Sequence, residues 1–299
     1  MKQTFIKLLP VPVLMMLFTS CASVREAKQE LRQEIVTVMQ ESRSVLKKLD
    51  RIDCIRSVKF ENKQLDEQSN QLIQHYTDSI RDHILEHMRQ DSQVVMRRIK
   101  HRSIDSLSVR ANTLKEQLKA DTENIGLIDS LLATNTYNQF NTASVFGPGE
   151  FKIDGSADSS KVIPFQRVVD DLLDFAAKFP NKKLNGTFLV LGYADGQQVS
   201  SGSGLDSTLR ISLGTTDSVG SPLLNKELSR LRAVSVSQLI SGVFGLKTNE
   251  GQSYPKLQVD YIPQGRGEEF PNPKIRNYQT DDERRRVVLV YWSILPDFN

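Results

Sequence analysis

Apolar residues recur at alternating spacings of four and three positions through much of the first half of the chain. One series consists of Leu31, Ile35, Val38, Ser42, Val45, Leu49 and Ile52. A second consists of Ile104, Leu107, Ala111, Leu114, Leu118, Asp121, Ile125, Ile128 and Leu132. This spacing is a heptad repeat, which places one face of an α-helix against a neighbouring helix. Between the two series the phase drifts, which indicates stutters or separate helices. We therefore expect two or three long, coiled-coil-like helices, packed as a hairpin or as an oligomeric coiled coil.

From Thr134 onward, short apolar segments replace the long heptad series. Residues 134–141 are polar and aromatic, which is typical of a linker or docking turn. The remaining signals predict a broken strand over 143–153, an amphipathic helix over 164–179, a buried strand over 187–191, a helix from Asn225, and strands over 256–262 and 284–292. Two helices that cross over one mixed sheet and cover one of its faces form an α/β sandwich of the α+β type. We expect that fold here.

The N-terminus has the features of an export signal. Lys2 and Lys7 precede an apolar run from Leu8 to Phe18 that is too short to span a bilayer. Small residues then precede Cys21, and the arrangement resembles a bacterial lipoprotein signal, in which palmitate or similar acyl chains modify the cysteine. Acylation would anchor the protein to a membrane without spanning it. An ordinary secretory peptide with an incidental cysteine is the alternative. No aspartate follows the cysteine, which by resemblance to sorted lipoproteins favours the outer membrane.

These patterns divide the chain into a signal peptide (1–20), a helical spacer (21–135) and a compact domain (136–299). Composition agrees with a soluble chain, since 38% of the residues are hydrophobic and 25% are charged. The formal net charge is +3, and Lys2 and Lys7 of the signal account for two of these charges. The remaining excess is too small to argue for nucleic-acid binding.

Candidate chemistry is sparse in the helical half. His83 and His87 are four residues apart and could share a metal ion on one helix face. No third ligand lies at a natural offset, so a solvated helix surface is the better interpretation, and we expect neither a metal nor a cofactor. Cys54 is the only cysteine besides Cys21, which excludes an intramolecular disulfide once Cys21 is acylated. Its apolar neighbours predict a small buried side chain.

Three motifs in the second half occur together and in a fixed order. The first comprises Asn225, Leu228, Ser229, Arg232, Ala233 and Val236. The second comprises Gly265, Arg266, Gly267 and Glu268 with Pro271, and the third is Arg285-Arg286-Val287. Over residues 143–292 the chain therefore resembles the OmpA-like peptidoglycan-binding domain. One departure is Arg284, which stands where that family usually has an asparagine.

The resemblance implies a site for a peptidoglycan stem peptide, in which an aspartate after the second strand and a helix arginine act together. A planar guanidinium suits a ligand carboxylate, and a partly buried carboxylate suits an ammonium group. Arg232 matches the arginine, and Asn225, Arg285 and Arg286 are further candidates. The alternative for Arg232 is a surface salt bridge, for example with Glu227 or Glu268. The Arg285–Arg286 pair could equally serve as charge that protects a sheet edge.

The aspartate has two candidates. Asp195 directly follows the strong strand over 187–191, so connectivity favours it, and residues 197–216 then become a loop at the rim of the site. Asp217 keeps the family's spacing to Asn225 and follows a weaker apolar stretch over 209–213, so spacing favours it. We prefer Asp195, but only geometry can decide.

We expect a lipid-anchored protein of the outer membrane, facing the periplasm, that binds peptidoglycan non-covalently. The alternative is a coiled-coil scaffold subunit of an envelope complex, homo-oligomeric through its helices and localised by its C-terminal domain. An enzyme is the weakest interpretation. The domain from residue 136 onward contains no histidine, no nucleotide-binding glycine loop and no nucleophile–base pair.

Overall fold

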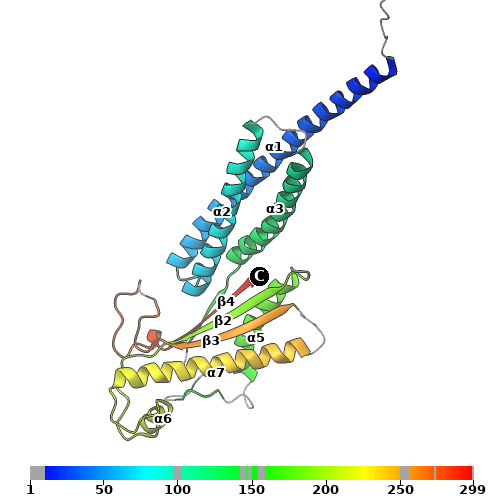
Figure 1. Cartoon of the computed structure of the whole chain (residues 1–299). Coiled ribbons are helices and arrows are strands. Elements are labelled where there is room, and N and C mark those ends of the chain that lie inside the picture. The colour runs from blue at the N-terminus through cyan, green and yellow to red at the C-terminus, as the bar shows by residue number, and fades with distance from the viewer. Residues whose placement is uncertain are drawn as a thin grey trace, which may run out of the picture. The chain divides into compact units, whose positions relative to one another are not determined.

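The computed structural model describes residues 11–96, 103–141, 146, 150–153, 159–249, 256–272 and 274–297. The chain forms two compact units, each assembled from separate stretches (Figure 1). The first comprises residues 1–54 and 74–126, and the second comprises residues 55–73 and 127–299. The helical part thus contributes residues to both units. Residues 1–10 of the expected signal lie outside the described residues, and so does the side chain of Cys21.

Three helices make up the N-terminal half: α1 (Val11–Glu61), α2 (Glu67–Met96) and α3 (Ile104–Ala133). The first heptad series is buried along its whole length, since each of its residues is at most 4% exposed. Leu31 and Ile35 of α1 pack there against Ala111 of α3. Arg81 of α2 contacts Asp53 of α1 at 2.5 Å. The prediction of separate long helices is confirmed, and their apolar seam is covered within one chain.

The helical half differs from expectation in the burial of Cys54. Cys54 is exposed on α1, so the prediction of a buried thiol is wrong. Its heptad neighbour Ile52 occupies the buried position instead. Among the described helices, none is long and apolar enough to cross a membrane.

The second unit contains a four-stranded mixed sheet, as predicted. Its strands are β1 (Tyr137–Asn141), β2 (Leu184–Gly192), β3 (Leu257–Gly265) and β4 (Val287–Pro296). Their order across the sheet is β1-β4-β2-β3. β2 and β3 are parallel, whereas β4 runs antiparallel to both β1 and β2. The last strand in sequence therefore lies between the first and the second.

Helices α5 (Ser159–Ala177) and α7 (Ser221–Asn249) pack on this sheet and on each other. In α5 the apolar side includes Phe165, which is fully buried, and Phe175, whose ring lies 5.9 Å from that of Trp292 on β4. Pro164 lies inside α5, because the helix begins earlier than predicted. Large aromatic rings between helix and sheet bury much apolar area, and this layer is the core of the unit.

The other face of the sheet is also apolar and covered. Its buried cluster consists of Leu189, Leu191, Tyr193, Val287, Leu289 and Tyr291. The turn between α1 and α2 lies against this cluster, where the Tyr291 hydroxyl donates to the Lys63 carbonyl at 3.2 Å. Lys59 of α1 also donates to the Thr134 carbonyl at 2.7 Å. These contacts explain why residues 55–73 belong to the same unit as the sheet.

Three local predictions are wrong. Residues 137–141 form the edge strand β1 and not a linker, because their backbone completes the ladder with β4. Residues 150–153 are irregular rather than a strand, while 143–145 lie outside the described residues. The stretch expected as a weak strand over 209–213 belongs largely to a short helix, α6 (Gly204–Ser212), so the predicted rim loop contains a helix.

Candidate functional site

The site forms where α7 crosses the carboxyl ends of β2 and β3. A Cβ atom built on Gly192 of β2 would lie 2.0 Å from the Ser229 carbonyl oxygen. One built on Gly265 of β3 would lie 2.6 Å from the Lys226 carbonyl oxygen. The Ser229 hydroxyl accepts a hydrogen bond from the backbone of Gly267 at 2.9 Å. The two glycines and the serine therefore let the helix backbone touch the strand ends and fix which helix residues face the site.

Backbone hydrogen bonds hold the segment after β2 on both sides. The Tyr193 amide donates to the Val287 carbonyl, and the Ala194 amide donates to the Gly267 carbonyl. The Gly196 amide then donates to the Thr280 carbonyl at 2.6 Å. Asp195 lies between these anchored residues and is 8% exposed. Its position is set by the fold, because backbone hydrogen bonds hold the residues on both sides of it.

Asp195 and Arg286 form the central ion pair of the site. The Arg286 Nε donates to Asp195 Oδ2 at 2.6 Å, and the Gln197 amide lies 3.4 Å from Oδ1. Arg286 follows the single-turn 3₁₀ helix η2 (Glu283–Arg285) and directly precedes β4. A half-buried charged hydrogen bond of this length is strong, because water screens it less than it would on the surface.

Arg232 extends from α7 into the same region and is 7% exposed. Its Nε donates to the Glu150 carbonyl at 3.1 Å, and its guanidinium lies 5.6 Å from the centre of the Phe146 ring. Burial lowers the pKa of Arg232 to about 10, while the Asp195 carboxylate raises it and Arg286 lowers it further. Arg232 therefore does not form the surface salt bridge that was the alternative interpretation. In this chain Arg230 binds Glu227 instead.

Two guanidinium groups thus lie near one carboxylate. Among the described residues, Arg232 makes one side-chain hydrogen bond, through Nε, and none directly to Asp195. Two planar guanidinium groups near one another suit a carboxylate ligand.

Asn225 connects the two loops that border the site. Its side-chain amide donates to the Gln197 carbonyl and to the Glu268 carboxylate, both at 2.9 Å, and the residue is 2% exposed. Arg285 is also buried, and its guanidinium donates to the Glu268 carbonyl at 2.5 Å. It donates as well to the Gln279 carbonyl at 3.3 Å. Both side chains therefore hold loops in place. Arg286 in contrast bonds to the Asp195 carboxylate, although it also donates to the Asp281 carbonyl at 3.4 Å, and Arg232 lies within electrostatic range of Asp195.

The structure places Asp217 away from this group. Asp217 is exposed, its backbone carbonyl accepts a hydrogen bond from Arg210, and its amide donates to Thr215. Of the two candidate aspartates, Asp195 is the one that lies with Arg286 and within electrostatic range of Arg232. The helix α6 and its flanking turns lie in the chain between Asp195 and Asn225.

Sequence reasoning missed the segment that covers Arg232. Phe146 is 4% exposed, and the Phe151 carbonyl accepts a hydrogen bond from Ser235 of α7. Glu150 contributes its main-chain carbonyl, so its side chain gives no sequence signal for the contact with Arg232. The helix within the predicted rim loop had a detectable signal, since Ser203 caps α6 by accepting from the Asp206 amide, the Ser-x-x-Asp pattern of a helix start.

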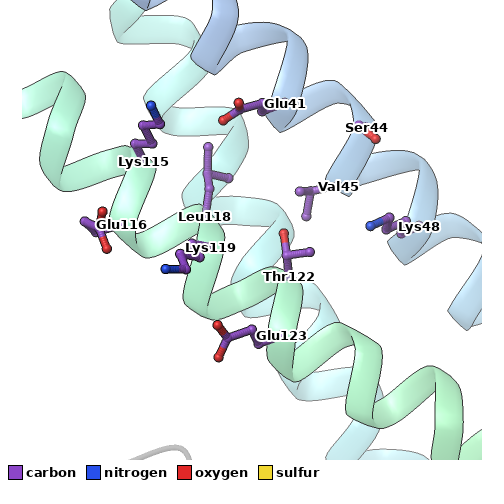
Figure 2. Close-up of a pocket in the computed structure, with 10 residues that line it drawn as sticks. All are labelled: Glu41, Ser44, Val45, Lys48, Lys115, Glu116, Leu118, Lys119, Thr122 and Glu123. Carbon is purple, nitrogen blue, oxygen red and sulfur yellow. The ribbon is translucent and has the colours of Figure 1, made fainter.

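A hollow lies in the first unit, between α1 and α3, with a volume of about 560 Å³ (Figure 2). Lysines and glutamates of both helices line it in equal numbers, and the buried side chains of Val45 and Leu118 line it as well. Such a balanced surface favours no particular ligand. Within the described ranges, no three histidine, cysteine or acidic residues gather as a metal site would require.

Comparison with known proteins gives a limited picture. No protein-family model matches the chain, and no curated protein matches it either. The crystal structure of the periplasmic domain of Helicobacter pylori MotB is similar with a TM-score of 0.28 and 13% identity, covering 52% of this chain and 72% of that chain. A second MotB periplasmic domain gives 0.27 and 14%, covering 55% of this chain and 64% of that one. Structural similarity this low supports no conclusion about function, so the function has to be inferred from the motifs and the geometry of the site.

Proposed function

We propose that the C-terminal unit binds peptidoglycan stem peptides non-covalently. The observation that supports this most is the convergence of Asp195, Arg286 and Arg232 at the carboxyl end of β2. A stem peptide offers free carboxylates and, at its diamino acid, an ammonium group. The arginines complement the first and the aspartate complements the second. The same elements carry the three motifs that resemble the OmpA-like domain.

Co-sedimentation with purified sacculi tests this proposal. A soluble form that begins at Ala22 should sediment with the sacculi, and Arg232→Ala should weaken binding at least about tenfold, because losing a buried charged contact costs about 2 kcal/mol or more. Arg230→Ala is the matched control, since Arg230 lies on the same helix and binds Glu227. Equal binding by wild type and Arg232→Ala would contradict the site assignment.

The two aspartates provide a second matched pair. Asp195→Asn should weaken sedimentation because it removes the charge that faces Arg286, whereas Asp217→Asn should bind as wild type does. If Asp217→Asn weakened sedimentation and Asp195→Asn did not, Asp217 would be the aspartate of the site.

We further propose that acyl chains on Cys21 hold the protein in the outer membrane and that it tethers this membrane to the wall from the periplasmic side. The N-terminal sequence pattern supports this part. Labelled palmitate should be incorporated into the wild type and not into Cys21→Ser, and the wild type should fractionate with outer membranes. Labelling of both forms would argue against acylation at this cysteine.

Binding without catalysis is part of the same proposal. Incubation with peptidoglycan should release no soluble muropeptides, and release above a buffer control would overturn it. The scaffold alternative requires helices that pack against helices of other chains. The first heptad series is buried within one chain, which favours a monomer, and light scattering on the soluble form would decide between the two.

A further inference from the structure

The segment between β3 and β4 connects the candidate site to the turn between α1 and α2. Near its start, the Glu268 carboxylate accepts a hydrogen bond from Asn225, which borders the site. Further along, the Lys274 ammonium group donates to the Asn62 side-chain carbonyl at 3.0 Å, and Asn62 lies in the α1–α2 turn. This turn belongs to the same compact unit as the sheet. One segment therefore contacts both the border of the site and the end of the helical hairpin.

Two backbone carbonyls and a buried leucine dock the turn itself. The Tyr291 hydroxyl donates to the Lys63 carbonyl at 3.2 Å, and the Thr136 hydroxyl donates to the Gln64 carbonyl at 3.4 Å. Leu65 is 4% exposed. Lys63 has a φ of 60°, in the left-handed region that residues other than glycine seldom adopt. Such a conformation persists when its surroundings fix it, so the contacts with β1 and β4 hold the turn in place.

Charges of the turn and of the site-bordering segment act on one side chain, Tyr291. Burial raises the pKa of Tyr291, the Asp66 carboxylate of the turn raises it further, and the Arg266 guanidinium lowers it. The hydroxyl therefore stays protonated at neutral pH and remains a donor. Arg266 directly precedes Gly267, whose amide donates to the Ser229 hydroxyl of α7. The turn and the beginning of the segment thus lie within electrostatic range of the same residue.

We propose that the α1–α2 turn is a positioning element for the ligand site, and that docking of the turn and binding of the ligand strengthen each other. This inference rests on the proposed function. The β3–β4 segment is largely irregular apart from η2, and a contact near its middle, at Lys274, limits the conformations in which Glu268 separates from Asn225. Because coupling of this kind is reciprocal, a ligand that fixes the segment also stabilises the docked turn. The helical half thereby influences how tightly the second unit binds the cell wall.

Hydrogen exchange on the full-length protein in detergent tests this link without any substitution. The amides of Asn62, Lys63 and Gln64 bond to carbonyls in the last turn of α1 and exchange when the turn opens. Saturation with soluble muropeptides prepared from sacculi should slow their exchange by about fivefold. Amides of residues 111–118 in α3, which belong to the other unit, should exchange as before. Unchanged exchange in the turn at saturation would overturn the inference, and so would equal slowing in both places.

Substitutions at the exposed contact provide a second measurement. Asn62→Ala and Lys274→Ala should each weaken sedimentation with sacculi by about threefold and leave the Tm nearly unchanged, because one exposed hydrogen bond contributes little to folding. The double variant should lose no more than either single variant, since both remove the same contact. Lys256→Ala is the matched control. Lys256 is an exposed lysine before β3 that donates to the Asn181 carbonyl, and its loss should leave binding unchanged.

The two measurements separate this inference from the proposed function. Wild-type affinity in both Asn62→Ala and Lys274→Ala would overturn the inference, because a turn that only covers the sheet does not affect the site. A wild type that sediments with sacculi while exchange in its turn stays unchanged would overturn the inference alone. A wild type that fails to sediment would overturn the proposed function with it.

Discussion

Gly192→Ala should move α7 off the end of β2. The added Cβ would lie 2.0 Å from the Ser229 carbonyl oxygen and 2.9 Å from its carbonyl carbon. Comfortable non-bonded contacts are about 3.5 Å, so the helix would have to retreat by more than about 1 Å. The obstacle is backbone, which cannot rotate away as a side chain could. Asn225 and Arg232 lie one turn on either side of Ser229 and would move with it.

Overpacking of this kind costs about 1–3 kcal/mol, and the rigid backbone oxygen places Gly192→Ala at or above the upper end. For a unit of this size, about 3 kcal/mol corresponds to a Tm lower by about 6–12 °C. Differential scanning calorimetry measures the shift, and co-sedimentation with sacculi measures the accompanying loss of binding.

Gly242→Ala is the matched control in the same helix. No atom lies within 4 Å of a Cβ built there, so the change should raise stability by about 0.5–1 kcal/mol through helix propensity alone. If Gly192→Ala melted at the wild-type temperature, or if both variants shifted alike, the close contact between α7 and β2 would be refuted.

Three further predictions concern the rest of the chain. Tyr291→Phe removes the donor to the Lys63 carbonyl and should lower the free energy of unfolding by about 0.5–1.5 kcal/mol; no change in chemical denaturation would show that the α1–α2 turn does not rest on the sheet. Hydrogen bonds from Arg230 lower the pKa of Glu227 below 4.5, so this carboxylate stabilises the fold fully above that pH and less as pH falls through its lowered pKa. Glu227→Gln should flatten that part of the acid unfolding profile, and an unchanged profile would contradict it. Cys54 is exposed, and maleimide should label it in the native protein as fast as a free thiol, whereas slow labelling would support burial.

The parts of the fold that the sequence predicts are those with dense apolar signals. The heptad positions from Leu31 to Ile52 are buried because a regular helix brings each of them to the same face. The strand over 187–191 was found because buried strands are continuous apolar runs. β1 was missed because Asn138, Gln139 and Asn141 carry no such signal, and their order comes from pairing with β4.

The candidate site was predictable in its residue types and less so in its arrangement. Arg232 and Asp195 could be named from sequence, because a motif and a preceding strand mark them. The pairing of Asp195 with Arg286 could not, since it joins residues far apart in the chain whose contact depends on how β2 and β4 align. Arg285 and Arg286 are adjacent and identical, and only the structure separates a loop-holding side chain from one that faces the aspartate.

The position of β4 has a consequence for how this protein is made. Residues 287–296 pair with β1 on one side and β2 on the other, so β1 and β2 cannot join into one sheet until these residues have been synthesised. The helices before residue 134 can form early, because their contacts are closer in sequence. Until β4 arrives, β1 and β2 expose unpaired edges, and the newly made chain has to be kept from aggregating. Stopping synthesis before Val287 would therefore leave a chain without the folded four-stranded sheet rather than a slightly shortened protein.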